Sequence, residues 1–158
     1  MLQFSLGQAF DSGLGVEEDA SKAVEWYRKA AEQGIMGAMY FLAQKYEDGQ
    51  SVQCDRDQAL YWYRKAGEGG LLEAQYQLGE HYLTREDQPI AENWRQAAFW
   101  FRKAAEQGYS NAQLRFACMN EDGLGIPQDP RAAEYWYRRA AEQGNELAQI
   151  ALEQYEAE

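Results

Sequence analysis

Apolar and polar positions follow a helical period along most of the chain, and the same pattern returns four times. In residues 19–34 the apolar side chains recur every three or four positions, and charged residues fill the positions between them. The apolar positions on this face are Ala23, Trp26, Tyr27, Ala30 and Ala31. The tryptophans at 26, 62, 100 and 136 mark the returns, in steps of 36, 38 and 36 residues. A fixed period in this range indicates stacked supersecondary units.

Each unit is predicted to contain two helices, of which the second carries the tryptophan in its core face. A short polar residue stands seven positions before each tryptophan, where its side chain can accept a free N–H of the first helical turn. The N-caps expected on this basis are Asp19, Asp55, Asn93 and Asp129. Glycines are expected to end these helices in the left-handed conformation, at Gly34, Gly70, Gly108 and Gly144.

The first helix of each unit is shorter, and in the second unit we expect it over residues 36–48. A small residue follows its core apolar position in every unit and should let a neighbouring helix come close. These small residues are Gly7, Ala43, Gly79 and Ala117. We predict repeats at about 1–34, 35–70, 71–108 and 109–144, a capping helix over 145–158, and a single domain over 1–158.

The third unit departs from the pattern because it is two residues longer between its helices. Ten residues separate Tyr82 from Asn93, where the other repeats have eight. Insertions in repeat arrays map to loops on one face, often the binding face. Trp94 follows the insertion, and two interpretations stay open: a contact residue for a partner, or a half-buried side chain that pins the longer loop.

The first repeat resembles the motif of Sel1-like repeats, relatives of the tetratricopeptide family, almost position for position. The residues that carry the resemblance are Leu6-Gly7, Phe10, Gly13-Leu14-Gly15-Val16, Asp19, Lys22-Ala23, Trp26-Tyr27 and Lys29-Ala30-Ala31-Glu32-Gln33-Gly34. The resemblance implies an all-α fold, a right-handed α-solenoid of antiparallel helix pairs. It also implies a protein-interaction scaffold, a role such proteins have as adaptors in bacterial signalling, secretion and envelope complexes. It implies no common catalytic residues.

The acidic net charge of the chain makes nucleic acid and anionic membranes unfavourable partners. The sequence has 15 basic and 26 acidic residues, a formal net charge of −11. Nucleic acid and anionic membranes would be repelled, so we expect a protein or peptide partner of basic character and no membrane insertion. A small homo-oligomer stays open, because Leu2 and Phe4 begin the array without a polar cap. The absence of a visible signal peptide favours the cytoplasm, with the periplasm as the alternative if a preceding segment has been removed.

No pattern of residues in the sequence indicates a catalytic site or a metal site. His81 is the only histidine and has no Cys or His at ligand spacing, so we expect no metal and no cofactor. Cys54 and Cys118 fall at different points of their repeats and do not form a disulfide framework. Cys118 also lacks a base within its own repeat, so we expect no enzymatic activity.

The expected binding surface lies on the first helices, which line the concave groove of the related tetratricopeptide arrays. Stacking would turn equivalent positions into stripes: an aromatic and aliphatic floor, an amide row and an acidic margin. The candidate partner-binding residues are Phe4, Gln8, Tyr40, Gln44, Glu47, Tyr76, Glu80, Leu83, Leu114 and Glu121. Two alternatives stay open: Tyr40 and its equivalents could pack between adjacent helices, and Glu47 could be an ordinary solvated residue.

The leading functional hypothesis is therefore a non-catalytic adaptor that binds a protein or peptide segment in this groove. The alternative is an immunity or inhibitor protein that neutralises a bacterial toxin or effector, whose basic active site an acidic surface could cover.

Overall fold

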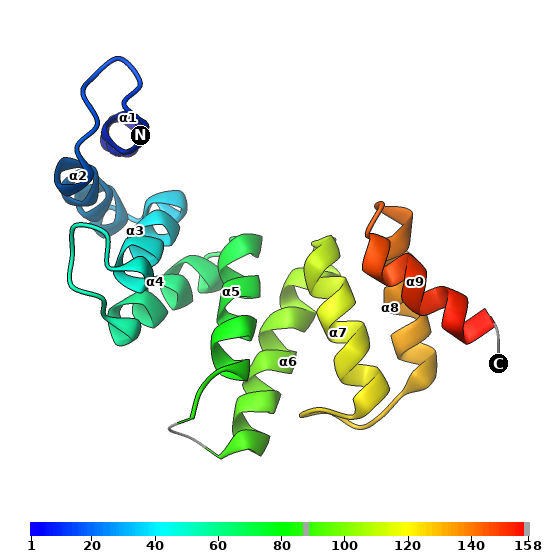
Figure 1. Ribbon diagram of the computed structural model, residues 1–158. Helices are drawn as coiled ribbons and strands as arrows, with labels where there is room; N and C mark the ends of the chain where they lie inside the picture. The colour runs from blue at the N-terminus through cyan, green and yellow to red at the C-terminus, as the bar shows by residue number, and fades with distance from the viewer. Residues whose placement is uncertain (87–88, 157–158) are drawn as a thin grey trace. The chain divides into compact units, whose positions relative to one another are not determined.

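The computed structural model describes residues 1–86 and 89–156, which form α-helices and no strand. The helices pair in sequence, α1 with α2 through α7 with α8, and α9 follows alone (Figure 1). Their bounds are α1 Leu2–Ser12, α2 Ala20–Glu32, α3 Met36–Asp48, α4 Arg56–Glu68, α5 Leu72–Leu83, α6 Ile90–Glu106, α7 Ser110–Asp122, α8 Pro130–Glu142 and α9 Glu146–Glu156. The all-α fold of helix pairs is confirmed.

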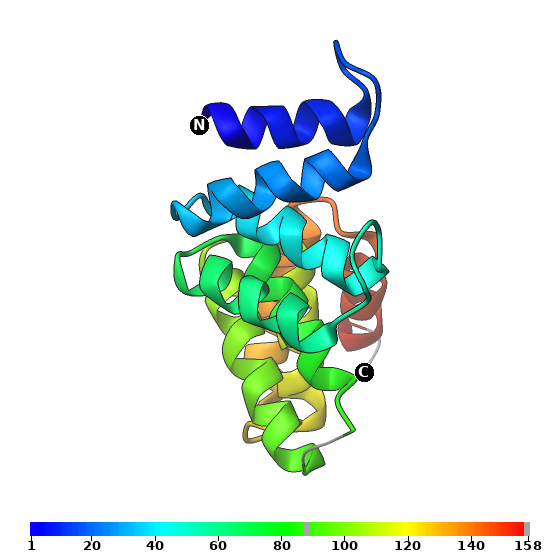
Figure 2. The same ribbon diagram turned by 90° about the vertical axis from the view of Figure 1, so that its left-hand side faces the viewer.

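The chain divides into two compact units, Met1–Ala74 and Gln75–Glu158. In the first unit α1 and α2 run antiparallel and α3 packs on α2 (Figure 2). The buried core there is built around Tyr27 and Leu42. In the second unit α7 packs on both α6 and α8, and α9 closes a cluster around Tyr137. The single domain expected over residues 1–158 stays a prediction.

Three of the four predicted N-caps are confirmed. Asp19, Asp55 and Asp129 each accept hydrogen bonds from backbone N–H groups of the first turn, at 2.9–3.1 Å. The bond from the Lys22 N–H holds the pKa of Asp19 below its ordinary value. The predicted terminal glycines, Gly34, Gly70, Gly108 and Gly144, all have positive φ, between 83° and 100°.

The N-cap expected at Asn93 is wrong. Helix α6 begins at Ile90 and has 17 residues, four more than α4 and α8, so it takes up residues that belong to the loop in the other repeats as well as the insertion. Asn93 therefore lies inside the helix and is buried. Its Nδ2 donates to the carbonyl oxygen of Arg85 at 2.9 Å, which ties the preceding loop to the helix. Residues 87–88 of the insertion lie outside the described residues.

The small residue of the first helix does allow a close approach. A Cβ at Gly7 would lie 2.6 Å from Cδ1 of Tyr27, and one at Gly79 would lie 2.4 Å from Cε1 of Phe101. The residue that fills the core is thus the one after each tryptophan, because Tyr27, Tyr63, Phe101 and Tyr137 are at most 2% exposed. The tryptophans contribute less to the core than expected: Trp100 is buried, whereas Trp26, Trp62 and Trp136 are half-buried, and Trp62 and Trp136 pack against the edge of the core clusters.

Gly125 supports a second close approach, between the loop after α7 and the backbone of α6. A Cβ there would lie 2.3 Å from the carbonyl carbon of Trp94, so the loop after α7 rests on the backbone of α6 just beyond its extra turn. Trp94 itself is half-buried. The loop can approach α6 this closely only because residue 125 lacks a side chain.

Replacing Gly125 by Ala should therefore destabilise the chain more than replacing Gly144 by Ala. Both residues have positive φ, 72° and 83°, and share the cost of about 1–2 kcal/mol for an L-residue there. Only Gly125→Ala adds overlap with backbone, which should cost about 1–3 kcal/mol more. Urea unfolding of the two variants measures the difference, and equal losses of stability would contradict the close approach.

Candidate functional site

Three buried tyrosines of the second helices donate hydrogen bonds to carboxylates near the ends of the first helices. The pairs are Tyr27 with Asp11 (Oη–Oδ2 3.2 Å), Tyr63 with Glu47 (Oη–Oε2 2.8 Å) and Tyr137 with Glu121 (Oη–Oε2 2.6 Å). Burial raises the pKa of each tyrosine above its ordinary value, and its hydrogen bonds and the nearby negative charge raise it further. These carboxylate–tyrosine pairs join the two helices of repeats one, two and four.

The third repeat replaces both members of the pair together. Leu83 stands where the other repeats have an acid, and Phe101 stands where they have tyrosine. A hydroxyl without its acceptor would be costly in the core, so an apolar residue at one position suits an apolar residue at the other. The joint replacement indicates that the pair acts as one element of the repeat.

Two of the carboxylates, Asp11 and Glu121, also contact the first helix of the following repeat or the final helix α9. Lys45, which is nearly buried on α3, forms an ion pair with Asp11 and donates to Oε1 of Gln50 at 2.9 Å. On α9, Tyr155 donates to Oε1 of Glu121 at 3.0 Å. Each of these two carboxylates therefore joins three consecutive helices.

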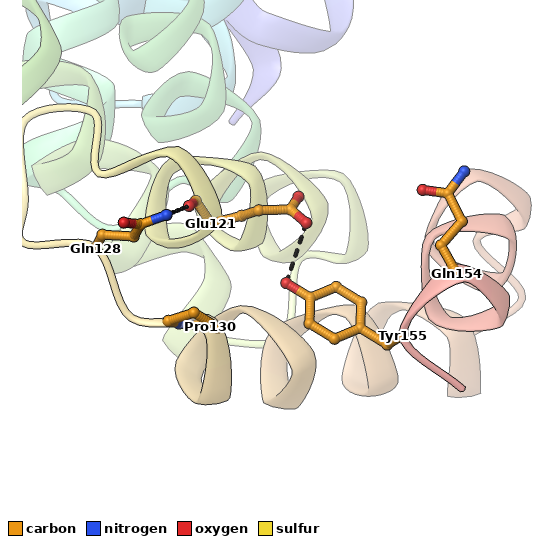
Figure 3. Close-up of a pocket in the computed structure, with 5 residues that line it drawn as sticks. All are labelled: Glu121, Gln128, Pro130, Gln154 and Tyr155. Atoms are coloured by element: carbon orange, nitrogen blue, oxygen red, sulfur yellow. Dashed lines mark hydrogen bonds between the residues drawn. The ribbon is translucent and has the colours of Figure 1, made fainter. Parts of the chain in front are cut away.

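The carboxylates of repeats two and four also line surface hollows at equivalent positions. The first hollow, of about 310 Å³, is lined by Glu47, Cys54 and Arg56. The second, of about 250 Å³, is lined by Glu121, Gln128, Pro130, Gln154 and Tyr155 (Figure 3). Glu47, Cys54 and Arg56 each stand 74 positions before Glu121, Gln128 and Pro130, in that order, so the two hollows occupy the same place in their repeats.

In both hollows a side chain of the loop donates a hydrogen bond to the backbone oxygen of the glutamate. In repeat four Nε2 of Gln128 donates to the backbone oxygen of Glu121 at 2.7 Å (Figure 3). In repeat two Sγ of Cys54 donates to the backbone oxygen of Glu47 at 3.3 Å. In repeat four the carboxylate is held by tyrosine hydroxyls and opens into the hollow, so it can receive a lysine or arginine without first being ordered, whereas in repeat two Arg56 itself lines the hollow beside Glu47.

The residues predicted for the apolar floor are half-buried and pack against the core. Phe4 lies 6.0 Å from the ring of Tyr27, and Tyr40 lies 5.6 Å from that of Tyr63, between ring centroids. Tyr76 lies 5.6 Å from the ring of Phe101. Leu114 packs on the cluster around Tyr137. Each therefore has a packing role, and the faces that stay exposed are what a partner could touch.

The other predicted residues fall into different environments. Gln8 is exposed on α1, and Leu83 is half-buried at the end of α5. Nε2 of Gln44 donates to the hydroxyl of Tyr40 at 3.2 Å, within one helix. Glu80 forms a two-pronged ion pair with Arg115 of α7, at 2.7 and 3.0 Å. Glu80 is thus engaged in a contact between repeats, and Gln44 in a contact within its own helix.

The sequence interpretation missed the tyrosine partners of Glu47 and Glu121, and with them Cys54 and Gln128. The tyrosine was assigned only to the core and the acid only to a surface stripe, although the joint change to Leu83 and Phe101 could have linked them. Over the described residues, no group of three His, Cys, Asp or Glu side chains could hold a metal ion. Within that same part of the chain, every helix is too short or too polar to cross a bilayer.

The family profile described as "Sel1 repeat" matches residues 2–35, 37–71, 72–109 and 110–145. No curated protein sequence matches the chain. The chain is similar to the crystal structure of a Sel1 repeat protein from Oxalobacter formigenes, with 37% identity and a TM-score of 0.88. That match covers 97% of this chain and 44% of the other.

Two further structures are similar. A protective antigen present in uropathogenic Escherichia coli strains, displaying an SLR fold, has 40% identity and a TM-score of 0.84, over 95% of this chain and 32% of its own. Cysteine rich protein B of Helicobacter pylori has 23% identity and a TM-score of 0.66, over 89% and 100%, a likeness of fold alone. The chain spans less than half the length of the Oxalobacter and Escherichia proteins.

The carboxylate–tyrosine pair should behave as a coupled unit in a double-mutant cycle. Glu121→Leu leaves the Tyr155 hydroxyl without its acceptor and the Tyr137 hydroxyl with only Sγ of Cys118, and it should cost about 1–3 kcal/mol, whereas Tyr137→Phe should cost about 1 kcal/mol. The double variant copies the combination at Leu83 and Phe101, so its loss should be at least about 0.5 kcal/mol smaller than the sum of the single losses. Urea unfolding measures all three, and additive losses would refute the coupling.

The raised tyrosine pKa values predict a loss of stability at alkaline pH. In the unfolded chain tyrosine ionises near pH 10, whereas these three tyrosines stay neutral to higher pH when folded. Their contribution is complete below about pH 10 and is lost as the pH rises through the folded pKa. The free energy of unfolding should therefore begin to fall near pH 10 and keep falling as the pH rises further, and Tyr137→Phe should reduce the fall. Tyr135→Phe, at a half-exposed position, is the control and should leave it unchanged.

Proposed function

The chain belongs to the Sel1 repeat family, and from that premise we propose that it is a non-catalytic adaptor that holds a basic protein or peptide segment. Sel1-repeat proteins are generally scaffolds for protein–protein interaction. The proposed binding residues are those of the first helices and the hollows that follow them, with Glu47 and Glu121 as the groups that receive lysine or arginine.

The observation that carries the proposal is the repetition of the hollows. The same three positions line a hollow in repeat two and in repeat four, and a buried tyrosine orients the carboxylate in both. A fixed carboxylate loses little conformational freedom when it binds a cation, so more of the electrostatic attraction appears as affinity. The formal charge of −11 would also speed the approach of a basic partner.

The proposed apolar contacts come from the exposed faces of Phe4, Tyr40, Tyr76 and Leu114. These side chains are held in place by packing, which reduces the entropy that binding would cost. Gln8, Gln44, Glu80 and Leu83 complete the proposed surface. Within each compact unit the proposed surface is presented by consecutive first helices, α1 with α3 and α5 with α7.

The alternative function, neutralisation of a bacterial toxin or effector, would use the same carboxylates against a basic active site. No contact described above favours it over an adaptor. The proposed compartment is the cytoplasm, in agreement with the free thiols of Cys54 and Cys118.

The test is a quantitative affinity capture from cells with the wild-type chain and with Glu47→Gln combined with Glu121→Gln. Glutamine keeps an oxygen for the tyrosine hydroxyl but removes the charge, so the fold should persist while binding weakens. We expect the captured basic partner to lose at least about tenfold in affinity, measured with the purified partner.

Glu25→Gln combined with Glu68→Gln is the matched control. It removes the same number of charges from exposed positions on α2 and α4. The control should bind as the wild type does. Equal losses in both double variants would point to net charge alone, and a partner that binds all three chains equally would refute the proposed role of the hollows.

A further inference from the structure

The second helices have a charge balance opposite to that of the rest of the chain. Each of α2, α4, α6 and α8 carries three basic and two acidic residues. Together they hold twelve of the 15 basic residues but only eight of the 26 acidic ones. The net charge of −11 therefore conceals four helices that are each weakly positive.

A basic pair recurs two and three positions after the tryptophan in every repeat. The pairs are Arg28-Lys29, Arg64-Lys65, Arg102-Lys103 and Arg138-Arg139. The first members at 102 and 138 form ion pairs within their helices, with Glu106 and Glu134, both at 2.7 Å. The second members behave differently, because each lies over aromatic rings of its own helix.

Three of these cations lie over a half-exposed ring four positions earlier. The distances to the ring centroids are 5.8 Å from Lys65 to Tyr61, 4.7 Å from Lys103 to Phe99 and 5.8 Å from Arg139 to Tyr135. The rings are 50%, 49% and 51% exposed, and each stands edge-on to the following tryptophan at about 5 Å. We call these three sets the ring–cation pairs. Each belongs to one helix, so it does not depend on how the two compact units are placed.

The first repeat shows that the fold does not require the exposed ring. Glu25 stands at the equivalent position of α2, and Lys29 still lies over the ring of Trp26, at 4.4 Å. The tryptophan thus keeps its cation without an aromatic neighbour before it. Large aromatic side chains that are half-exposed at one register in three repeats, and are dispensable in the fourth, are typical of an interaction surface.

We propose that the ring–cation pairs bind acidic protein segments that also carry apolar side chains, the pairs of α6 and α8 within the second compact unit and the pair of α4 within the first. The cation would receive a carboxylate, and the exposed ring would receive an apolar side chain. The ring beneath the cation also fixes its position and leaves its outer side free for an anion. This surface is separate from the acidic hollows, and the proposal does not rest on the function proposed for them.

The test measures binding of a short fluorescein-labelled peptide of alternating Glu and Leu pairs to the whole chain by fluorescence anisotropy. Phe99→Glu combined with Tyr135→Glu copies the residue that repeat one already accepts, so the melting temperature should stay unchanged while affinity falls at least about tenfold. The reciprocal variant Glu25→Tyr adds a fourth ring–cation pair and should raise the affinity. Replacing Leu by Ser in the peptide, or raising the salt concentration, should weaken binding.

A second variant keeps the test decisive if the glutamates disturb the fold. Lys103→Gln combined with Arg139→Gln leaves the rings in place and removes only the cations, and it should also lose at least about tenfold in affinity. Affinities unchanged in both double variants would overturn the proposal. The proposal would also be overturned if single-stranded DNA bound the same residues more tightly than the peptide does. Self-association of the wild-type chain in sedimentation, if the ring variants abolished it, would overturn the proposal as well.

Discussion

In repeats one and three the contact on which the helix pair depends is that between one buried ring of the second helix and the backbone of the first. The ring of Tyr27 or Phe101 occupies the space that a side chain at Gly7 or Gly79 would fill. This contact sets the distance between the paired helices. Because the ring is fully buried, its hydroxyl needs an acceptor, and the acid at the end of the first helix supplies one. The hollows and their oriented carboxylates follow from that requirement.

Much of this architecture could be predicted from periodicity and from the chemistry of helix ends. Asp19, Asp55 and Asp129 cap helices because their side chains act on their own backbone, within three residues. The insertion was harder to place, since extra residues can either lengthen a loop or extend a helix. In the structure the helix is extended, Asn93 is buried, and its side chain bonds to the carbonyl oxygen of Arg85. Burial and this bond depend on tertiary contacts, which the sequence pattern does not show. The burial of the tryptophans was harder to predict for a related reason: in repeats one, two and four the neighbouring tyrosine takes the core position and the tryptophan stays half-buried, and the spacing does not show which of two adjacent aromatic residues is buried more deeply.

The candidate site was predictable in its residue types but not in its connections. Glu47 and Glu121 were expected at an acidic margin, yet their bonds to Tyr63 and Tyr137 join residues 16 positions apart. The repeats also separate charge by helix, which a net charge cannot reveal. Acidic side chains gather at the ends of the first helices and in the loops, while cations sit over rings on the second helices. An adaptor with two such surfaces could hold segments of opposite charge at once.

The most direct test of the adaptor account is hydrogen–deuterium exchange of the chain, free and bound to its captured partner. The account predicts slower exchange on binding in the segments that line the hollows, 47–56 and 121–130, together with the first helices that carry the proposed surface. Protection confined to segments away from these helices and hollows would contradict it, as would a complex that shows no protection anywhere in the chain.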